Sequence, residues 1–168
     1  MGCTAVRLLA MMDFEVTAVT GKLGETPSLK GIGAKAVLDR ELLLEDPDRA
    51  LLKGTWAAGV DTVGGVYLDS MFRSLKLHAV LAVCGNAASP ELNTNVYPFI
   101  LRGVRLQGID SAHTPLDVRK EMWRRLGSDW KLNGIDAFIR TCTLSELNGY
   151  IDAMLVGSGY GRLVVNLS

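Results

Sequence analysis

The chain has 168 residues, of which 48% are hydrophobic and 21% charged, so it can bury a sizeable core as one domain. Lys and Arg together number 18, as do Asp and Glu, and this balance argues against nucleic-acid or membrane-surface partners, which favour a basic excess. No apolar run approaches the roughly 20 residues of a membrane-spanning helix, and residues 1–4 do not open a secretory signal. We therefore expect a cytoplasmic protein.

Helical and strand-like patterns alternate along the chain, which favours a parallel sheet covered by helices. In the first half we expect a largely buried helix at residues 4–12, a strand at 14–20, a short helix at 26–33 and a strand at 36–38. An irregular segment at 39–53 follows, and after it a strand at 59–63 and a helix at 67–75. Thr26 is expected to cap the short helix, with Pro27 as its first residue.

The second half repeats the alternation. We expect a strand at residues 78–84, a polar loop at 85–96, a strand at 104–110 and a long helix at 114–130. A strand at 138–142, a helix at 145–155 and a strand at 163–165 complete the chain. The strand at 78–84 is a continuous apolar run, which predicts burial on both faces. The long helix carries an apolar face at Leu116, Val118, Met122, Trp123 and Leu126, and Ser145 is expected to cap the last helix.

In an open parallel sheet, ligands bind at the carboxyl ends of the strands. Thr20, Gly21 and Lys22 follow the first predicted strand, where folds that prefer NAD place a carboxylate. A hydroxyl and a cation suit a ribose 2′-phosphate instead, and Arg40, after the next strand, is a second cation for the same phosphate. The alternative is that Lys22 and Arg40 are ordinary solvated charges.

Other strand and helix ends carry weaker signals. Gly2 and Cys3 precede the first helix, where a phosphate-binding turn ends, although one glycine there is equally a simple helix start. Asp61 reads either as a general acid or, as we favour, as a structural residue that caps the following helix or binds loop amides. Gly85, followed by Asn86, permits a close backbone approach. The three cysteines and two histidines lack zinc-site spacing, so no metal site is expected.

Four segments in order resemble the medium-chain dehydrogenase/reductase superfamily, specifically its zinc-free quinone-oxidoreductase-like branch, which includes acryloyl-CoA reductases. The segments are Val19–Lys22, Trp56–Gly65, Val83–Gly85 and Phe99–Ser111. The resemblance implies a Rossmann-like α/β fold, a doubly wound parallel sheet that binds NADPH. It places Ile100 against the nicotinamide ring and Ser111 near the mouth of the site. The cofactor-binding set it implies is Gly2, Cys3, Thr20, Gly21, Lys22, Arg40, Gly85, Asn86, Ile100 and Ser111.

The resemblance also implies that the chain is a portion of a longer enzyme. Residues 1–155 would form an incomplete nucleotide-binding domain, and residues 156–168 would return to a catalytic domain outside the chain. The first strand of the fold, with the early glycines of its turn, would precede Met1. Because that strand lies at the centre of the sheet, we expect two half-sheets with unpaired inner edges. The chain alone should then be inactive, and unstable without a partner.

The function implied is NADPH-dependent reduction of an activated C=C bond, as in an enoyl- or acryloyl-CoA, or of a quinone-like acceptor. The acceptor would be a small molecule, with neither nucleic acid nor membrane as a partner. The parent enzyme would be a homodimer joined through the strand at residues 104–110. The alternative is an interaction or regulatory module that keeps the fold without catalysis.

Overall fold

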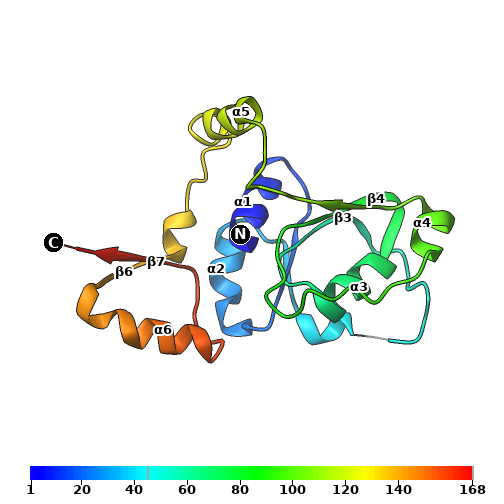
Figure 1. Ribbon diagram of the computed structural model, residues 1–168, viewed down its shortest axis with the longest axis horizontal. Coiled ribbons are helices and arrows are strands. Elements are labelled where there is room, and N and C mark those ends of the chain that lie inside the picture. Colours follow the sequence, from blue (N-terminus) through cyan, green and yellow to red (C-terminus); the bar gives the residue numbers. More distant parts are fainter. Residues whose placement is uncertain (45, 168) are drawn as a thin grey trace.

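The computed structural model describes residues 1–44 and 46–167 (Figure 1). Its helices are α1 (Gly2–Met11), α2 (Thr26–Gly31), α3 (Gly65–Arg73), α4 (Tyr97–Arg102), α5 (Leu116–Leu126) and α6 (Leu147–Leu155). Short 3-10 turns are η1 (Leu23–Glu25), η2 (Arg40–Leu43), η3 (Ile135–Phe138) and η4 (Leu144–Glu146). The strands are β1 (Thr17–Thr20), β2 (Ala36–Asp39), β3 (Trp56–Asp61), β4 (Leu75–Val83), β5 (Arg105–Gly108), β6 (Ile139–Thr143) and β7 (Arg162–Asn166). None of these helices could span a membrane.

The strands form three separate parallel sheets, of order β1-β2, β3-β4-β5 and β6-β7. This is the Rossmann-like α/β arrangement that the sequence predicts. Within the described residues β1 and β3 do not pair with each other, so each half-sheet has an unpaired inner edge. These unpaired edges agree with the expectation, but the described strands form three sheets and not two, because β6 and β7 pair only with each other.

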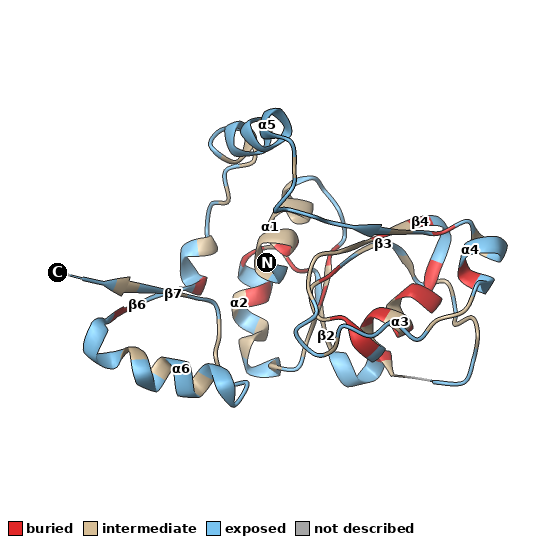
Figure 2. Cartoon of the chain, viewed as in Figure 1, coloured by how far each residue is buried: buried red, intermediate tan, exposed pale blue. Residues whose placement is uncertain are grey.

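Each half-sheet has its own hydrophobic core (Figure 2). The first lies between α1, α2 and β1, where Val6, Ala18 and Ile32 are buried. The second lies between α3 and β4, where Phe72 and Leu81 have no exposed surface. Because apolar burial is the main favourable term in folding, the two halves are stabilised largely by separate clusters.

Strand β4 differs from the sequence prediction. Within the predicted strand, Ala79 and Leu81 are buried, but Val80 and Ala82 are only partly buried and His78 is exposed, so full burial on both faces is not observed. The core beside β4 lies on the side of α3. A bulge shifts the register of β4 against β3. His78 has a φ of 59° there, in the left-handed region.

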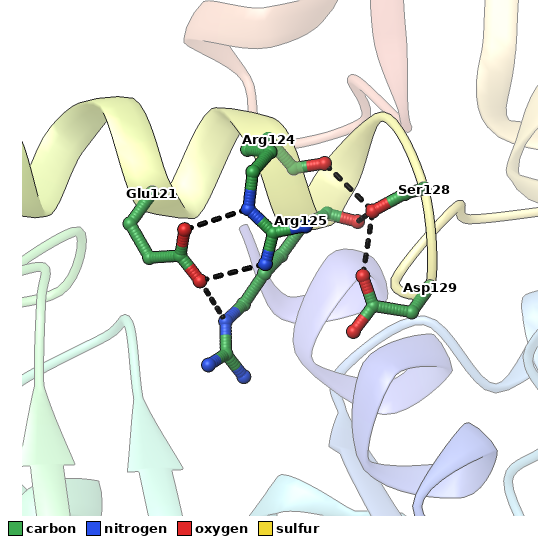
Figure 3. A network of polar contacts seen from close by, with 5 residues as sticks. All are labelled: Glu121, Arg124, Arg125, Ser128 and Asp129. Atoms are coloured by element: carbon green, nitrogen blue, oxygen red, sulfur yellow. Dashed lines mark hydrogen bonds and ion pairs between the residues drawn. The ribbon is translucent and has the colours of Figure 1, made fainter.

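Helix α5 stands away from the rest of the chain (Figure 1). None of its residues is buried, and Trp123 of the predicted apolar face is 68% exposed. The helix is supported by its own ion pairs: the Glu121 carboxylate accepts hydrogen bonds from Arg124 Nε at 2.7 Å and from Arg125 Nε at 2.7 Å (Figure 3). These contacts, Arg124 first, lower the pKa of Glu121 to about 2.

Two predicted helix caps are wrong, because a 3-10 turn precedes each helix. Thr26 is the first residue of α2, and its hydroxyl donates to the Leu23 carbonyl at 2.7 Å. Before α6, Thr143 rather than Ser145 forms a capping box with Glu146. Beyond α6, β7 pairs in parallel with β6, so part of residues 156–168 has a partner within this chain. The domain boundary at residue 155 stays a prediction.

Candidate functional site

The turn after β1 closes on its own side chains. The Thr20 hydroxyl accepts a hydrogen bond from the backbone N–H of Lys22 at 3.0 Å. The Lys22 ammonium donates to the Gly159 carbonyl, in the loop before β7. Lys22 is therefore a partly buried cation that joins two distant segments, and not a fully solvated surface charge.

Arg40 comes to this turn because β1 and β2 are parallel neighbours, with Thr20 opposite Asp39. A Cβ atom added to Gly21 would lie 2.7 Å from Arg40 Nε and 3.0 Å from its Cζ. The guanidinium thus rests on the backbone at Gly21, and a side chain at this position would displace it. The structure brings Arg40 against Gly21, within the turn of Thr20 and Lys22, whereas the Lys22 side chain points to Gly159.

Two residues that the sequence analysis missed hold Arg40 on its other side. The Arg40 Cζ lies 5.2 Å from the centroid of the Tyr67 ring, and its Nε lies 3.3 Å from Glu41 Oε1. The Tyr67 hydroxyl donates to the same oxygen at 2.8 Å, which raises the pKa of Tyr67. Glu41 adjoins Arg40 in sequence, but no sequence pattern connects Tyr67 with either residue.

A cavity of about 440 Å³ adjoins the turn on the side of α6 and β7. Its lining includes Lys22, Arg140, Tyr150, Met154, Ser158 and Tyr160. Arg140 Cζ lies 5.2 Å from the centroid of the Tyr160 ring. Apolar surface with two cations suits a ligand that has both a ring and an anionic group.

The start of α1 lies near the same turn. The Cys3 thiol is partly buried, and burial is the main cause of its raised pKa; nearby Glu25 raises it further, whereas the terminal amino group lowers it. Glu25 belongs to η1, which begins directly after Lys22. A Cβ added to Gly2 would meet nothing within 4 Å, so the described structure gives no packing reason for glycine at that position.

The loops after β3 and β4 pack on each other. Asp61 is 4% exposed, and its Oδ2 accepts hydrogen bonds from the backbone N–H groups of Gly64 at 2.9 Å and Val63 at 3.3 Å. Burial raises the pKa of Asp61, which these bonds partly offset. Of the two structural readings of Asp61, the bond to loop amides agrees with this geometry, whereas Gly64 is the N-cap of α3.

Gly85 and Asn86 belong to this loop contact. A Cβ added to Gly85 would lie 2.4 Å from the Thr62 carbonyl oxygen, and one added to Gly64 would lie 3.2 Å from the Asn86 Cα. The close backbone approach that Gly85 permits is therefore an approach to the neighbouring loop. Their contact with a cofactor stays a prediction.

The last two predicted residues lie at opposite ends of the second half-sheet. Ser111 is exposed beyond the carboxyl end of β5, where its carbonyl accepts from Arg119 at 2.8 Å. Ile100 is 68% exposed on α4, whose Arg102 donates to the Arg73 and Leu75 carbonyls where β4 begins. The structure therefore does not bring Ile100 to the strand ends that carry the other residues.

Among the residues that the structure describes, no three His, Cys, Asp or Glu side chains come together as a metal site. After β1 and β2, Arg40 lies against Gly21 and beside Glu41, and the Thr20 hydroxyl accepts from the Lys22 backbone N–H, whereas the Lys22 ammonium donates to the Gly159 carbonyl. A planar guanidinium such as that of Arg40 suits an anion with free oxygens, and a phosphate monoester fits it.

Residues 1–128 match a family described as zinc-binding dehydrogenase. The acrylyl-CoA reductase AcuI of Ruegeria pomeroyi is 37% identical over 167 residues, which are 99% of this chain and 51% of that protein.

Two solved structures are similar over nearly the whole chain. Bacillus subtilis yhfP with NAD bound is 37% identical with a TM-score of 0.89, over 98% of this chain and 50% of that one. Escherichia coli YhdH with bound NADPH is 36% identical with a TM-score of 0.91, over 99% of this chain and 51% of that one. The chain spans about half the length of the relatives it matches.

Proposed function

This chain belongs to the zinc-binding dehydrogenase family, within the medium-chain dehydrogenase/reductase superfamily, and we propose that it is the NADPH-binding portion of an oxidoreductase. One observation carries the proposal: Arg40 rests on Gly21, beside the turn that Thr20 and Lys22 close. This places two cations and a hydroxyl after neighbouring parallel strands, where the ribose of a dinucleotide lies in such folds.

The preference for NADPH over NADH rests on charge. A 2′-phosphate brings about two negative charges at neutral pH, which Lys22 and Arg40 neutralise. A 2′-hydroxyl would instead favour a carboxylate directly after β1, where this chain has Thr20, Gly21 and Lys22. Since the similar solved structures hold NAD in one case and NADPH in another, the choice depends on this chain's own residues.

The reaction we propose for the whole protein is reduction of an activated C=C bond, as in an enoyl- or acryloyl-CoA, or of a quinone-like acceptor. The names of the relatives, acrylyl-CoA reductase and putative quinone oxidoreductase, support this class. The bound nicotinamide supplies the hydride, while the residues of this chain bind and orient the cofactor. We also propose that the reaction uses no zinc held by this chain, because its Cys and His residues lack zinc-site spacing.

Calorimetric titration with NADPH and NADH, after light scattering has shown the chain to be unaggregated, tests the proposal. We expect selective NADPH binding, and a loss of about tenfold or more in NADPH affinity for Arg40→Ala, since a hydrogen bond to a charged group contributes about 1.5–3 kcal/mol. Arg49→Ala is the control, because Arg49 is an exposed arginine 4.0 Å from Asp46. Equal affinities for both cofactors would refute NADPH selectivity, and no binding by a folded chain would favour the interaction module.

A further inference from the structure

Arg40 is held from three directions. The Tyr67 ring lies under its guanidinium at 5.2 Å, the backbone at Gly21 lies against its Nε and Cζ, and Glu41 Oε1 lies 3.3 Å from its Nε. The Tyr67 hydroxyl donates to that same Glu41 oxygen at 2.8 Å, so Arg40, Glu41 and Tyr67 form one connected unit.

The unit leaves the outer edge of the guanidinium open. The Nε is engaged, whereas no hydrogen bond or ion pair joins the two terminal nitrogens to any group in the described part of the chain. The Arg40 side chain is 48% exposed. Two parallel N–H donors on a planar fork match two oxygens of a phosphate. A side chain already held in place also loses less conformational entropy when a ligand binds.

We propose that Tyr67, linked through Glu41, is a positioning residue that holds Arg40 open for a phosphate monoester on a ribose. This inference rests on the proposed function, in which that phosphate is the 2′-phosphate of NADPH. Tyr67 acts through Arg40 and does not itself touch the cofactor. It therefore affects binding of the phosphorylated cofactor and not of the unphosphorylated one.

A purely structural role would look different. Tyr67 lies on α3 and Glu41 on η2, and the Ser70 hydroxyl of α3 also donates to the Leu43 carbonyl of η2. The α3–η2 contact thus has a second hydrogen bond, which does not involve Arg40. Ser70→Ala loosens the same contact and leaves the guanidinium's partners in place, so it is the matched control.

The test compares NADPH and NADH dissociation constants for the full chain carrying Tyr67→Leu, Tyr67→Phe or Ser70→Ala. Loss of an exposed cation–π contact lowers affinity by roughly two- to fivefold, and we expect Tyr67→Leu to lose this much for NADPH alone. Tyr67→Phe keeps the ring and should stay within about twofold of the wild type for NADPH. Ser70→Ala should lower thermal stability without changing the ratio of the two affinities.

A double-mutant cycle distinguishes a failure of the positioning role of Tyr67 from a failure of the proposed function. In an Arg40→Ala background, Tyr67→Leu should no longer change NADPH affinity, because the group that Tyr67 positions is absent. Equal losses for both cofactors, or an unchanged NADPH affinity in Tyr67→Leu, would overturn the positioning role while wild-type selectivity stands. If the wild type does not prefer NADPH, or Arg40→Ala keeps the preference, the proposed function itself fails and this inference fails with it. If Tyr67→Leu does not fold, Tyr67→Met, with an unbranched side chain that favours helix, replaces it in the same cycle.

Discussion

Gly21→Ala should weaken NADPH binding and leave folding almost unchanged. The new Cβ would lie 2.7 Å from Arg40 Nε, 3.0 Å from Cζ and 3.2 Å from Cδ, whereas ordinary contacts begin near 3.4 Å. Arg40 is half exposed, so its guanidinium can withdraw by several tenths of an ångström at small cost to the fold. The withdrawal separates it from a phosphate that it would otherwise contact. Losing one charge-assisted hydrogen bond costs about 1.5 kcal/mol, which predicts roughly tenfold weaker NADPH binding.

The assay is calorimetric titration of both cofactors together with urea unfolding. NADH affinity should stay within about twofold, and the free energy of unfolding within about 0.5 kcal/mol. Gly24→Ala is the matched control, because a Cβ at Gly24, in the adjoining η1, meets nothing within 4 Å. If Gly21→Ala binds NADPH as tightly as Gly24→Ala does, the contact between Arg40 and Gly21 does not position the phosphate ligand.

Other predictions address the scaffold. By NMR, Glu121 should titrate with a pKa of about 2, and in Arg124→Gln this pKa should move toward its ordinary value of 4.5. Because the folded pKa is lowered, the stability that Glu121 gives to α5 is present above about pH 4.5 and is lost as the pH falls to about 2. An unshifted titration would contradict the ion pairs. Asp61→Ala should destabilise by about 1–3 kcal/mol, and Asp61→Asn by less, because asparagine still accepts from the loop amides; equal losses in urea unfolding would argue against those bonds. Amide exchange should be slower in β4, which is paired on both sides, than in β1.

The order and type of most elements could be predicted from sequence because period and turn residues are local signals. Burial could not. The apolar run at 78–84 suggested two covered faces, yet Val80 and Ala82 are only partly buried because the described core lies on the α3 side. The predicted strand at 14–20 begins only at Thr17, where its pairing with β2 starts opposite Ala36. Both differences arise from tertiary contacts that a local pattern does not contain.

The candidate site divides in the same way. Thr20, Gly21 and Lys22 are adjacent in sequence, and Arg40 follows the next parallel strand, so a sheet rule is enough to group them. Tyr67 joins them only because η2 docks on α3, which depends on side chains from both elements. Ile100 illustrates the converse: a resemblance assigns it to the cofactor, but α4 holds it at the other end of the half-sheet.

The contact between η2 and α3 has added weight because the two half-sheets share no strand pairing in the described chain. Arg40 follows the first half-sheet, and Tyr67 lies on the helix that covers the second. The position of the guanidinium therefore depends on both halves, whereas Thr20 and Lys22 depend on the first half and on Gly159. A phosphate bound by Lys22 and Arg40 would favour the arrangement in which both halves are docked, since a ligand stabilises the state that binds it. By the same linkage, a change that loosens the η2–α3 contact and displaces Arg40 should weaken NADPH binding more than NADH binding. A change that loosens the contact without displacing Arg40 should weaken the binding of both cofactors equally.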